Sequence, residues 1–415
     1  MSDYTHVDVY SVQSPKKHGM PCGDMLATLR TNTGTTIICA DGIGSGIRAH
    51  IAAQMCVSRL TESLKQDISL RTVFQSVATT MQSYRDPQKP FAAFSIARIR
   101  SDGNATVFSY DAPYPILVSR HGATVLANRP FPLPGGLAME SNCQLDMGEG
   151  LLLMSDGITQ AGLGHGANTE WTSEGIVRFI NNKISSRVRL SLAPEMIHQE
   201  ALARWKGEAQ DSSRPTKDGS FSPYSSDVRR QATRRLPGKV TGDDCSIILG
   251  LCRTGQTVNL LTGPPQNKDD DVATVKRFLQ LPGLKIVCGG TTSKLVAKYL
   301  NVPLEMETEP MSTIAPPRYG IKGINLVTEG AVTLNQVYNI LDENVANLQE
   351  DSGVTELRLL LGVADKLNII LGKADNTANA DISFRQRGVL SRKVLIPLLA
   401  EKLRQEGKLV NVELV

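Results

Sequence analysis

The chain has 415 residues, of which 41% are hydrophobic and 21% are charged, and its formal net charge is +4. The length predicts a globular protein of two or three domains. The charge is too small for this length to indicate nucleic-acid binding. No run approaches 18 apolar residues, and the first residues lack a basic-then-apolar signal pattern. We therefore expect a cytoplasmic protein that does not associate with membranes.

The seven cysteines form no CxxC pair, and the six histidines have neither HxH nor HxxxH spacing. Four of the cysteines lie in or beside apolar, strand-like runs, where a thiol behaves as a small hydrophobic group: Cys39, Cys245, Cys252 and Cys288. We expect buried, reduced thiols and no zinc site.

The first 252 residues read as short strands with helical intervals. Strands are expected at 7–13, 25–31, 35–42, 91–100, 104–112, 114–122, 151–157 and 243–252. A helix pair is expected at about 46–67 and 69–84, and two more helices within 169–206. The apolar residues at helical spacing in the first of these helices are Ile47, Ile51, Met55, Leu60 and Leu64. Residues 207–240 are poor in apolar residues and rich in Ser, Pro, Arg and Lys, which predicts a long flexible loop.

From about 256 to 415, strand and helix patterns alternate. Helices are expected at 269–281, 291–301 and 390–408, and strands at 284–290, 323–330 and 367–373. This alternation predicts an α/β domain with a parallel sheet.

Aspartates recur where an apolar strand runs into a turn. They are Asp24 in PCGDML, Asp41 in IICADGIGSG, Asp156 in LLLMSDGI, and the pair Asp243 and Asp244 in TGDDCSIIL. Carboxylates that converge at strand ends form an all-oxygen site, which suits Mg²⁺ or Mn²⁺ better than zinc. The glycine after Asp41 allows a sharp turn that leaves a carbonyl free for a cation. Taken alone, however, each Asp-Gly pair is the commonest kind of turn.

The runs IICADGIGSGIRAH, LLLMSDGI and DDCSIILG resemble the signature blocks of the metal-dependent protein phosphatase (PPM) superfamily. They are most similar to its bacterial branch, represented by the phosphatase domain of stage II sporulation protein E. The resemblance covers roughly residues 5–252. It implies an α-β-β-α sandwich of two antiparallel sheets with a metal site at one end. We thus expect a phosphatase domain at 1–252 and an accessory α/β domain of unknown role at 256–415.

Carried over by motif, the resemblance implies five metal-binding residues. Asp41 would bridge two cations, and the carbonyl of Gly42 would bind the first. Asp156 and Asp244 would hold the second, and Asp24 would lie near the first, directly or through water. The cations would be Mn²⁺ or Mg²⁺, about 3.5–4 Å apart, and would share a hydroxide that attacks phosphorus. Such a site needs no cysteine or histidine nucleophile.

The implied activity is hydrolysis of phosphoserine or phosphothreonine on a regulatory protein, such as an antagonist of an anti-sigma factor. The roles of two acids stay open: Asp243, because the family uses the second acid of the pair, and Asp111, which could assist a third metal or simply lie in a turn. The animal branch grips the phosphate with an arginine in its first strand. No equivalent precedes Asp24, so the residue that binds phosphate has no assignment.

Two regulatory features each have a structural alternative. In the sporulation-type branch the helix pair after DGxGxG positions the metal-binding aspartates, but such a pair is also an ordinary outer helical layer. The arginines of the loop at 207–240 could attract an acidic phosphoprotein, or they could belong to a solvated insertion. These arginines are Arg229, Arg230, Arg234 and Arg235.

The run CGGTTSKLVAKYL predicts a strand, a glycine turn and a helix, and VTEGAVTLNQ has a similar form. The helix N-terminus could bind an anion, or Thr291, Thr292 or Ser293 could cap it. Two such turns predict a small-ligand pocket at the C-terminal edge of the sheet. The alternative to an active phosphatase is therefore a ligand-sensing or partner-binding protein whose phosphatase domain is its output or a vestigial scaffold.

Overall fold

The computed structural model describes residues 4–44, 46–83, 91–134, 136–163, 171–184, 188–207, 242–306, 318–343, 352–374 and 389–415. They form two compact units, Thr5–Arg253 and Thr254–Val415, and Tyr4 belongs to the second. The loop predicted at 207–240, with its four arginines, lies outside the described residues except for Gly207. Within the described ranges, no helix combines the length and apolar character needed to cross a bilayer.

The first unit contains two antiparallel sheets. The larger has the strand order β2-β3-β4-β5-β9-β8, and the smaller has the order β1-β11-β10-β6-β7. The strands of the larger sheet are β2 (Asp24–Thr31), β3 (Gly34–Gly42), β4 (Ala92–Ile99), β5 (Asn104–Tyr110), β8 (Arg129–Leu133) and β9 (Gly136–Gln144). Those of the smaller are β1 (Thr5–Ser14), β6 (Ile116–Ser119), β7 (Gly122–Val125), β10 (Gly150–Met154) and β11 (Cys245–Thr254).

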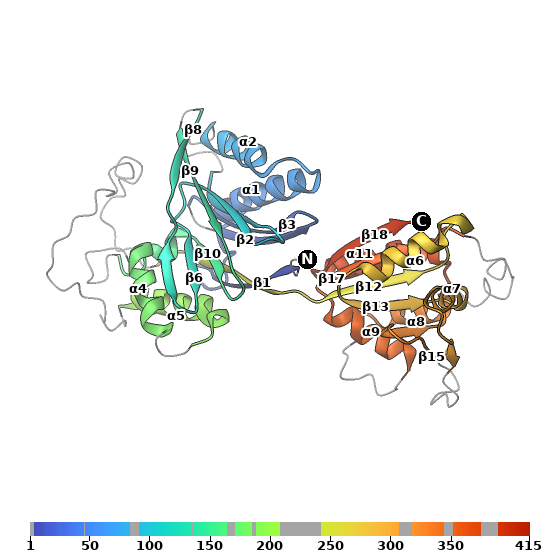
Figure 1. Cartoon of the computed structure of the whole chain (residues 1–415). Coiled ribbons are helices and arrows are strands. Elements are labelled where there is room, and N and C mark those ends of the chain that lie inside the picture. The colour runs from blue at the N-terminus through green and yellow to red at the C-terminus, as the bar shows by residue number, and fades with distance from the viewer. Residues whose placement is uncertain are drawn as a thin grey trace. The chain divides into compact units, whose positions relative to one another are not determined.

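Alternation along the central strands builds the layers of this unit. In β3, Ile37 points into a core shared with Leu151 of β10, so the two sheets pack face to face. The neighbouring Ile38 points the other way, toward α1 (Ile47–Lys65) and α2 (Leu70–Ser83). In β10, Leu152 faces the core formed with α4 (Thr172–Ile184) and α5 (Ala193–Lys206). Figure 1 shows each helix pair along its own sheet. The result is the predicted α-β-β-α sandwich.

The helix α1 buries a different face from the one that its large apolar residues suggest. Ile47, Ile51 and Met55 are 62%, 48% and 50% exposed, whereas Leu60 and Leu64 are buried. The first half of α1 packs instead through small residues, Ala49, Ala52, Ala53 and Cys56. Small side chains let this part of the helix approach the sheet closely, because they fill little of the interface.

The second unit contains one seven-stranded sheet with the order β14-β15-β16-β13-β12-β17-β18. Its strands are β12 (Thr257–Thr262), β13 (Leu284–Cys288), β14 (Glu305–Met306), β15 (Arg318–Gly320), β16 (Leu326–Thr328), β17 (Lys366–Leu371) and β18 (Leu409–Leu414). The ladders from β16 to β18 are parallel, as predicted. The prediction contained β13, β16 and β17 but missed the parallel strands β12 and β18. It also missed β14 and β15, which join the edge antiparallel.

Helices cover both faces of this sheet. One core contains residues of α6 (Asp271–Gln280) and α7 (Gly290–Leu300). The other contains residues of α8 (Ala331–Asn339), α9 (Gly353–Val363) and α11 (Arg392–Gln405). In chain order the five parallel strands are arranged 3-2-1-4-5, a doubly wound topology.

The glycine turn before α7 differs from its predicted form. Gly289 is the N-cap residue, and no side chain caps the helix. Thr292 instead accepts a hydrogen bond from the backbone N–H of Gly263, 2.9 Å away, so the prediction that a hydroxyl caps this helix is wrong. The hydroxyl of Thr292 is therefore engaged by the loop after β12, a contact between distant segments that the local sequence does not predict.

A cavity of about 620 Å³ lies in the second unit beside β15 and β16. The residues that line it include Val302, Arg318, Tyr319, Lys322, Asn325 and Glu356. Neither glycine turn lines this cavity, so the ligand pocket expected at those turns stays a prediction.

Candidate metal site

Two of the predicted ligands lie side by side at one end of the larger sheet. β2 begins at Asp24 and β3 ends at Gly42, and the antiparallel register pairs Asp24 with Asp41. Neighbouring strands therefore bring together two carboxylates that are 17 positions apart in the chain. The turn after β3 is tightly covered, because a Cβ added at Gly42 would lie 1.9 Å from the carbonyl oxygen of Ala49 in α1.

The other two acids meet at the end of the smaller sheet. Asp156 begins the one-turn helix α3 (Asp156–Thr159) just after β10, and Asp244 immediately precedes β11. These strands pair antiparallel, with Met154 opposite Ile247. A Cβ added at Gly157 would lie 2.0 Å from the backbone oxygen of Asp244. Only glycine permits this close approach of the two turns.

The two sheet ends converge on each other. A Cβ added at Gly23, next to Asp24, would lie 2.8 Å from Oδ2 of Asp244. The charges of Asp244 and Asp156 both raise the pKa of Asp24, and that of Asp156 raises the pKa of Asp41. The structure thus brings all four predicted aspartates together, each from a different strand end.

Burial makes the carboxylates of Asp24 and Asp41 costly to ionise. Asp24 is 2% exposed, and neither of its carboxylate oxygens has a hydrogen-bond partner. Burial raises its pKa to about 7, although the nearby hydroxyls of Ser155 and Ser246 oppose the shift. Burial and the charges of Asp156 and Asp24 raise the pKa of Asp41 well above its ordinary value. A cation placed among these groups would remove both the desolvation cost and the mutual repulsion.

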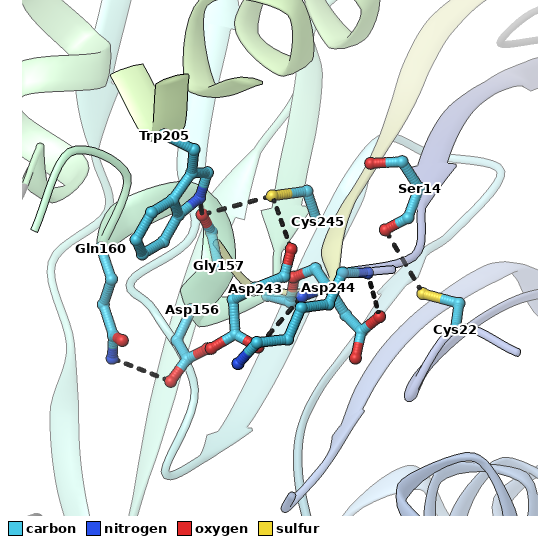
Figure 2. Close-up of polar contacts among 11 residues, drawn as sticks. Ser14, Cys22, Asp156, Gly157, Gln160, Trp205, Asp243, Asp244 and Cys245 are labelled. Carbon is cyan, nitrogen blue, oxygen red and sulfur yellow. Dashed lines mark hydrogen bonds and ion pairs between the residues drawn. The ribbon is translucent and has the colours of Figure 1, made fainter. Parts of the chain in front are cut away.

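The donor set fits a hard divalent cation, although the side chains do not form a finished coordination cage. In the described part of the chain, no three His, Cys, Asp or Glu side chains have the spacing of a metal site. The oxygens are partly engaged elsewhere: Asp156 Oδ2 accepts from Gln160 Nε2 (Figure 2), and Asp244 Oδ1 accepts from the backbone N–H of Lys16, both at 2.8 Å. Two orphaned oxygens on Asp24 and an all-oxygen donor set are nevertheless what Mg²⁺ or Mn²⁺ requires.

The structure adds three residues that sequence reasoning missed. Trp205 of α5 donates from Nε1 to the carbonyl oxygen of Gly157 at 2.9 Å (Figure 2). His50 of α1 donates from Nδ1 to the carbonyl oxygen of Cys22 at 2.9 Å, beside the Gly23 turn. Lys16 contacts both Asp243 and Asp244. Only His50 had a signal, as the last residue of the DGxGxGxRAH run.

The two doubtful acids occupy different places. Asp243 lies beside Asp244, and its Oδ1 accepts from the N–H of Asp244 at 3.0 Å. Its charge also raises the pKa of Asp41. Asp111 follows β5 in a turn with a positive φ of 52°. The four cysteines expected to be buried are buried as free thiols.

Comparison with known proteins assigns the larger part of this unit. Residues 31–211 match the family model described as stage II sporulation protein E (SpoIIE). No curated protein sequence matches the chain significantly.

Among solved structures, the phosphatase domain of SpoIIE from Bacillus subtilis is 15% identical with a TM-score of 0.40, covering 61% of this chain and 95% of that one. The SiaA-PP2C domain of Pseudomonas aeruginosa is 13% identical with a TM-score of 0.40, covering 59% and 85%. RsbX in complex with magnesium is 15% identical with a TM-score of 0.34, covering 61% and 97%. The match over residues 31–211 covers the larger part of the first unit but less than half of the chain, and this segment is therefore similar to the SpoIIE family.

Proposed function

We propose that the first unit is a divalent-metal-dependent protein serine/threonine phosphatase. The observation that carries this proposal is the convergence of four aspartates from two sheets. One of these aspartates, Asp24, is buried, and neither of its carboxylate oxygens has a hydrogen-bond partner. Burying several carboxylates together is unfavourable without a counter-charge. Such an arrangement is typical of a site that takes up cations.

Each residue of the site has a role in this proposal. Asp41, the carbonyl of Gly42, Asp156 and Asp244 would hold two divalent cations, Mn²⁺ or Mg²⁺, with support from Asp24. When bound, the cations would activate a water molecule and neutralise phosphate charge. The protein would orient the ligands: Gln160 fixes the carboxylate of Asp156, and the backbone of Lys16 fixes that of Asp244.

The thiols near the site do not offer an alternative nucleophile. Burial and the charge of Asp24 raise the pKa of Cys22 to about 12. Burial likewise raises the pKa of Cys245. A thiol acts as a nucleophile only as the thiolate, which these shifts suppress at neutral pH. Covalent catalysis by these cysteines is therefore disfavoured, and attack by an activated water fits the site better.

The substrate in this proposal is a phosphoserine or phosphothreonine on a regulatory protein, such as an antagonist of an anti-sigma factor. Support comes from the match to the SpoIIE family over residues 31–211. Release of inorganic phosphate from phosphoserine and phosphotyrosine peptides would separate this specificity from a general phosphatase activity.

Mn²⁺-dependent hydrolysis of an aryl phosphate tests the catalytic proposal. Wild type is compared with Asp41→Ala and Asp156→Asn, and with Asp146→Asn, which neutralises an exposed acid of the same unit. Loss of a bridging or terminal carboxylate should weaken metal binding and lower the turnover by about a hundredfold or more. Asp146→Asn should match wild type. Equal turnover in all four proteins would contradict the proposal.

A second candidate function rests on the cavity of about 620 Å³ in the second unit. Its volume falls within the range of small-molecule sites. Its lining combines Arg318, Lys322 and Glu356 with apolar side chains, so a ligand with both charged and apolar groups would suit it. This unit would then sense a ligand, and the phosphatase would be its output.

A further inference from the structure

Lys16 lies at the edge of the candidate metal site on the loop between β1 and β2. Its ammonium Nζ is 3.6 Å from Oδ1 of Asp243, and its backbone N–H donates to Oδ1 of Asp244 at 2.8 Å. The side chain is 23% exposed. The backbone contact fixes the position of the Lys16 main chain, and the flexible four-carbon side chain allows the ammonium group to move.

The loop that carries Lys16 is anchored at both ends. Ser14 Oγ lies 2.8 Å from Nε2 of His198 in α5. At the other end, the carbonyl of Cys22 accepts from His50 in α1, and the thiol of Cys22 donates to the carbonyl oxygen of Ser14 at 3.6 Å. These contacts tie the loop to helices on both outer layers. Lys16 is therefore held at the site by structure on both of its sides.

The contact between Lys16 and Asp243 is loose. At 3.6 Å it is an ion pair beyond hydrogen-bond distance, so moving the ammonium away breaks no hydrogen bond to this acid. A phosphate dianion carries more charge than one carboxylate and accepts several charge-assisted hydrogen bonds. An arriving phosphoryl group would therefore compete well for this ammonium.

On this basis we propose that Lys16 is a substrate-binding residue whose ammonium contacts the phosphoryl group, and that Asp243 holds the ammonium in place until substrate arrives. The inference rests on the proposed phosphatase function. It also gives a role to Asp243 that does not require it to bind metal. No bond is made or broken by Lys16, which contributes charge and orientation only.

The test uses the full chain loaded with Mn²⁺ and three variants, Lys16→Gln, Lys16→Arg and Lys17→Gln. All three keep the backbone N–H of residue 16, so the contact to Asp244 survives. Lys17 is the exposed neighbour and serves as the matched control. Calorimetry gives the Kd for inorganic phosphate and, separately, for Mn²⁺. Steady-state kinetics with an aryl phosphate gives KM and kcat.

Lys16→Gln should raise the phosphate Kd and the KM by about tenfold or more, because a charge-assisted contact is lost, while the Mn²⁺ Kd stays within about twofold of wild type. Lys16→Arg should recover most of the loss, and Lys17→Gln should match wild type. A phosphate Kd equal in Lys16→Gln and Lys17→Gln would overturn the inference.

Weaker Mn²⁺ binding in Lys16→Gln with unchanged phosphate binding would also overturn it, since Lys16 would then only support Asp243 and Asp244. Absence of turnover in wild type would contradict the phosphatase proposal instead. Phosphate binding by the Mn²⁺-loaded protein still decides the role of Lys16 in that case, and its absence in wild type would overturn the inference as well.

Discussion

Asp24 shows most clearly what it costs in stability to bury carboxylates at the candidate metal site. Its carboxylate is buried without a hydrogen bond, and its pKa is raised to about 7 from an ordinary 3.8, mainly by burial. Because the folded pKa is the higher one, the folded state prefers the protonated acid. In the metal-free protein, the contribution of Asp24 to the free energy of unfolding is therefore fully present below about pH 4 and is lost as the pH rises through about 7.

Replacing Asp24 by asparagine removes this titration. In EDTA at pH 8, Asp24→Asn should have a higher melting temperature than wild type, with a free energy of unfolding larger by on the order of a few kcal/mol. Toward pH 4 the two proteins should become equally stable. Excess Mn²⁺ should reduce or reverse the gap, because wild type then gains a ligand that the variant lacks. Melting followed by tryptophan fluorescence reports the first unit, since both tryptophans, Trp171 and Trp205, lie there.

Asp146→Asn controls for the change of one surface charge. It should leave the melting temperature close to that of wild type at both pH values. If Asp24→Asn proves less stable than wild type at pH 8 in EDTA, then a contact stabilises the buried carboxylate by more than its desolvation costs. The claim that the ionised Asp24 destabilises the metal-free protein would then be wrong.

At the scale of elements, outer-layer helices hold the turns that carry the aspartates. α1 presses Ala49 against the Gly42 turn and bonds the Cys22 carbonyl through His50. α5 bonds the carbonyl of Gly157 through Trp205. The turns are thus fixed from outside each sheet, and a change in either helix would move a carboxylate.

The two tryptophans offer a matched pair for testing this support. Trp205→Phe keeps an aromatic ring but removes the N–H that bonds Gly157. Trp171→Phe removes an N–H that is buried without a partner. Calorimetry should show a Mn²⁺ Kd raised about tenfold in Trp205→Phe, as for the loss of a group that orients a ligand, and unchanged in Trp171→Phe. Similar Mn²⁺ affinities in the two variants would contradict a supporting role for α5.

Elements whose signal is local were predictable, and those that depend on distant partners were not. The strand ending at Asp41 and the helix pair after it follow from apolar periodicity and a glycine-rich turn. The exposure of Ile47, Ile51 and Met55 could not be foreseen, because periodicity shows that a helix is amphipathic but not which neighbours its small residues admit. The periodicity therefore predicted the helix but not the face that it buries.

The second unit shows the same limit. Three of its parallel strands, β13, β16 and β17, were recognised by their apolar runs, whereas the parallel strands β12 and β18 were missed. The edge strands β14 and β15, of two and three residues, are too short to carry a pattern. In the site, the strand-end positions of the aspartates indicated an all-oxygen cation site, and the PPM resemblance supplied the role of each residue. Lys16 was missed because its contact with Asp244 spans 228 positions.

At the scale of the whole molecule, each unit has its own hydrophobic cores. The first has cores on both outer faces and between its sheets, and the second has one on each face of its single sheet. Tyr4 belongs to the second unit, where its carbonyl accepts from the N–H of Gly255 at 2.7 Å and its ring lies beneath the ammonium of Lys366. A unit with a complete core is expected to fold without its neighbour.

We therefore expect a fragment of residues 5–253 to fold and to hydrolyse an aryl phosphate with Mn²⁺ at a kcat within a few-fold of the full chain. Circular dichroism and tryptophan fluorescence establish folding, and Asp41→Ala in the fragment serves as the inactive control. A fragment that is unfolded would show that the first unit needs the second for stability. A folded fragment whose kcat differs more than about tenfold from the full chain would instead favour a second unit that controls the phosphatase, because removing a mere accessory leaves the chemistry of Asp41 and its partners unchanged.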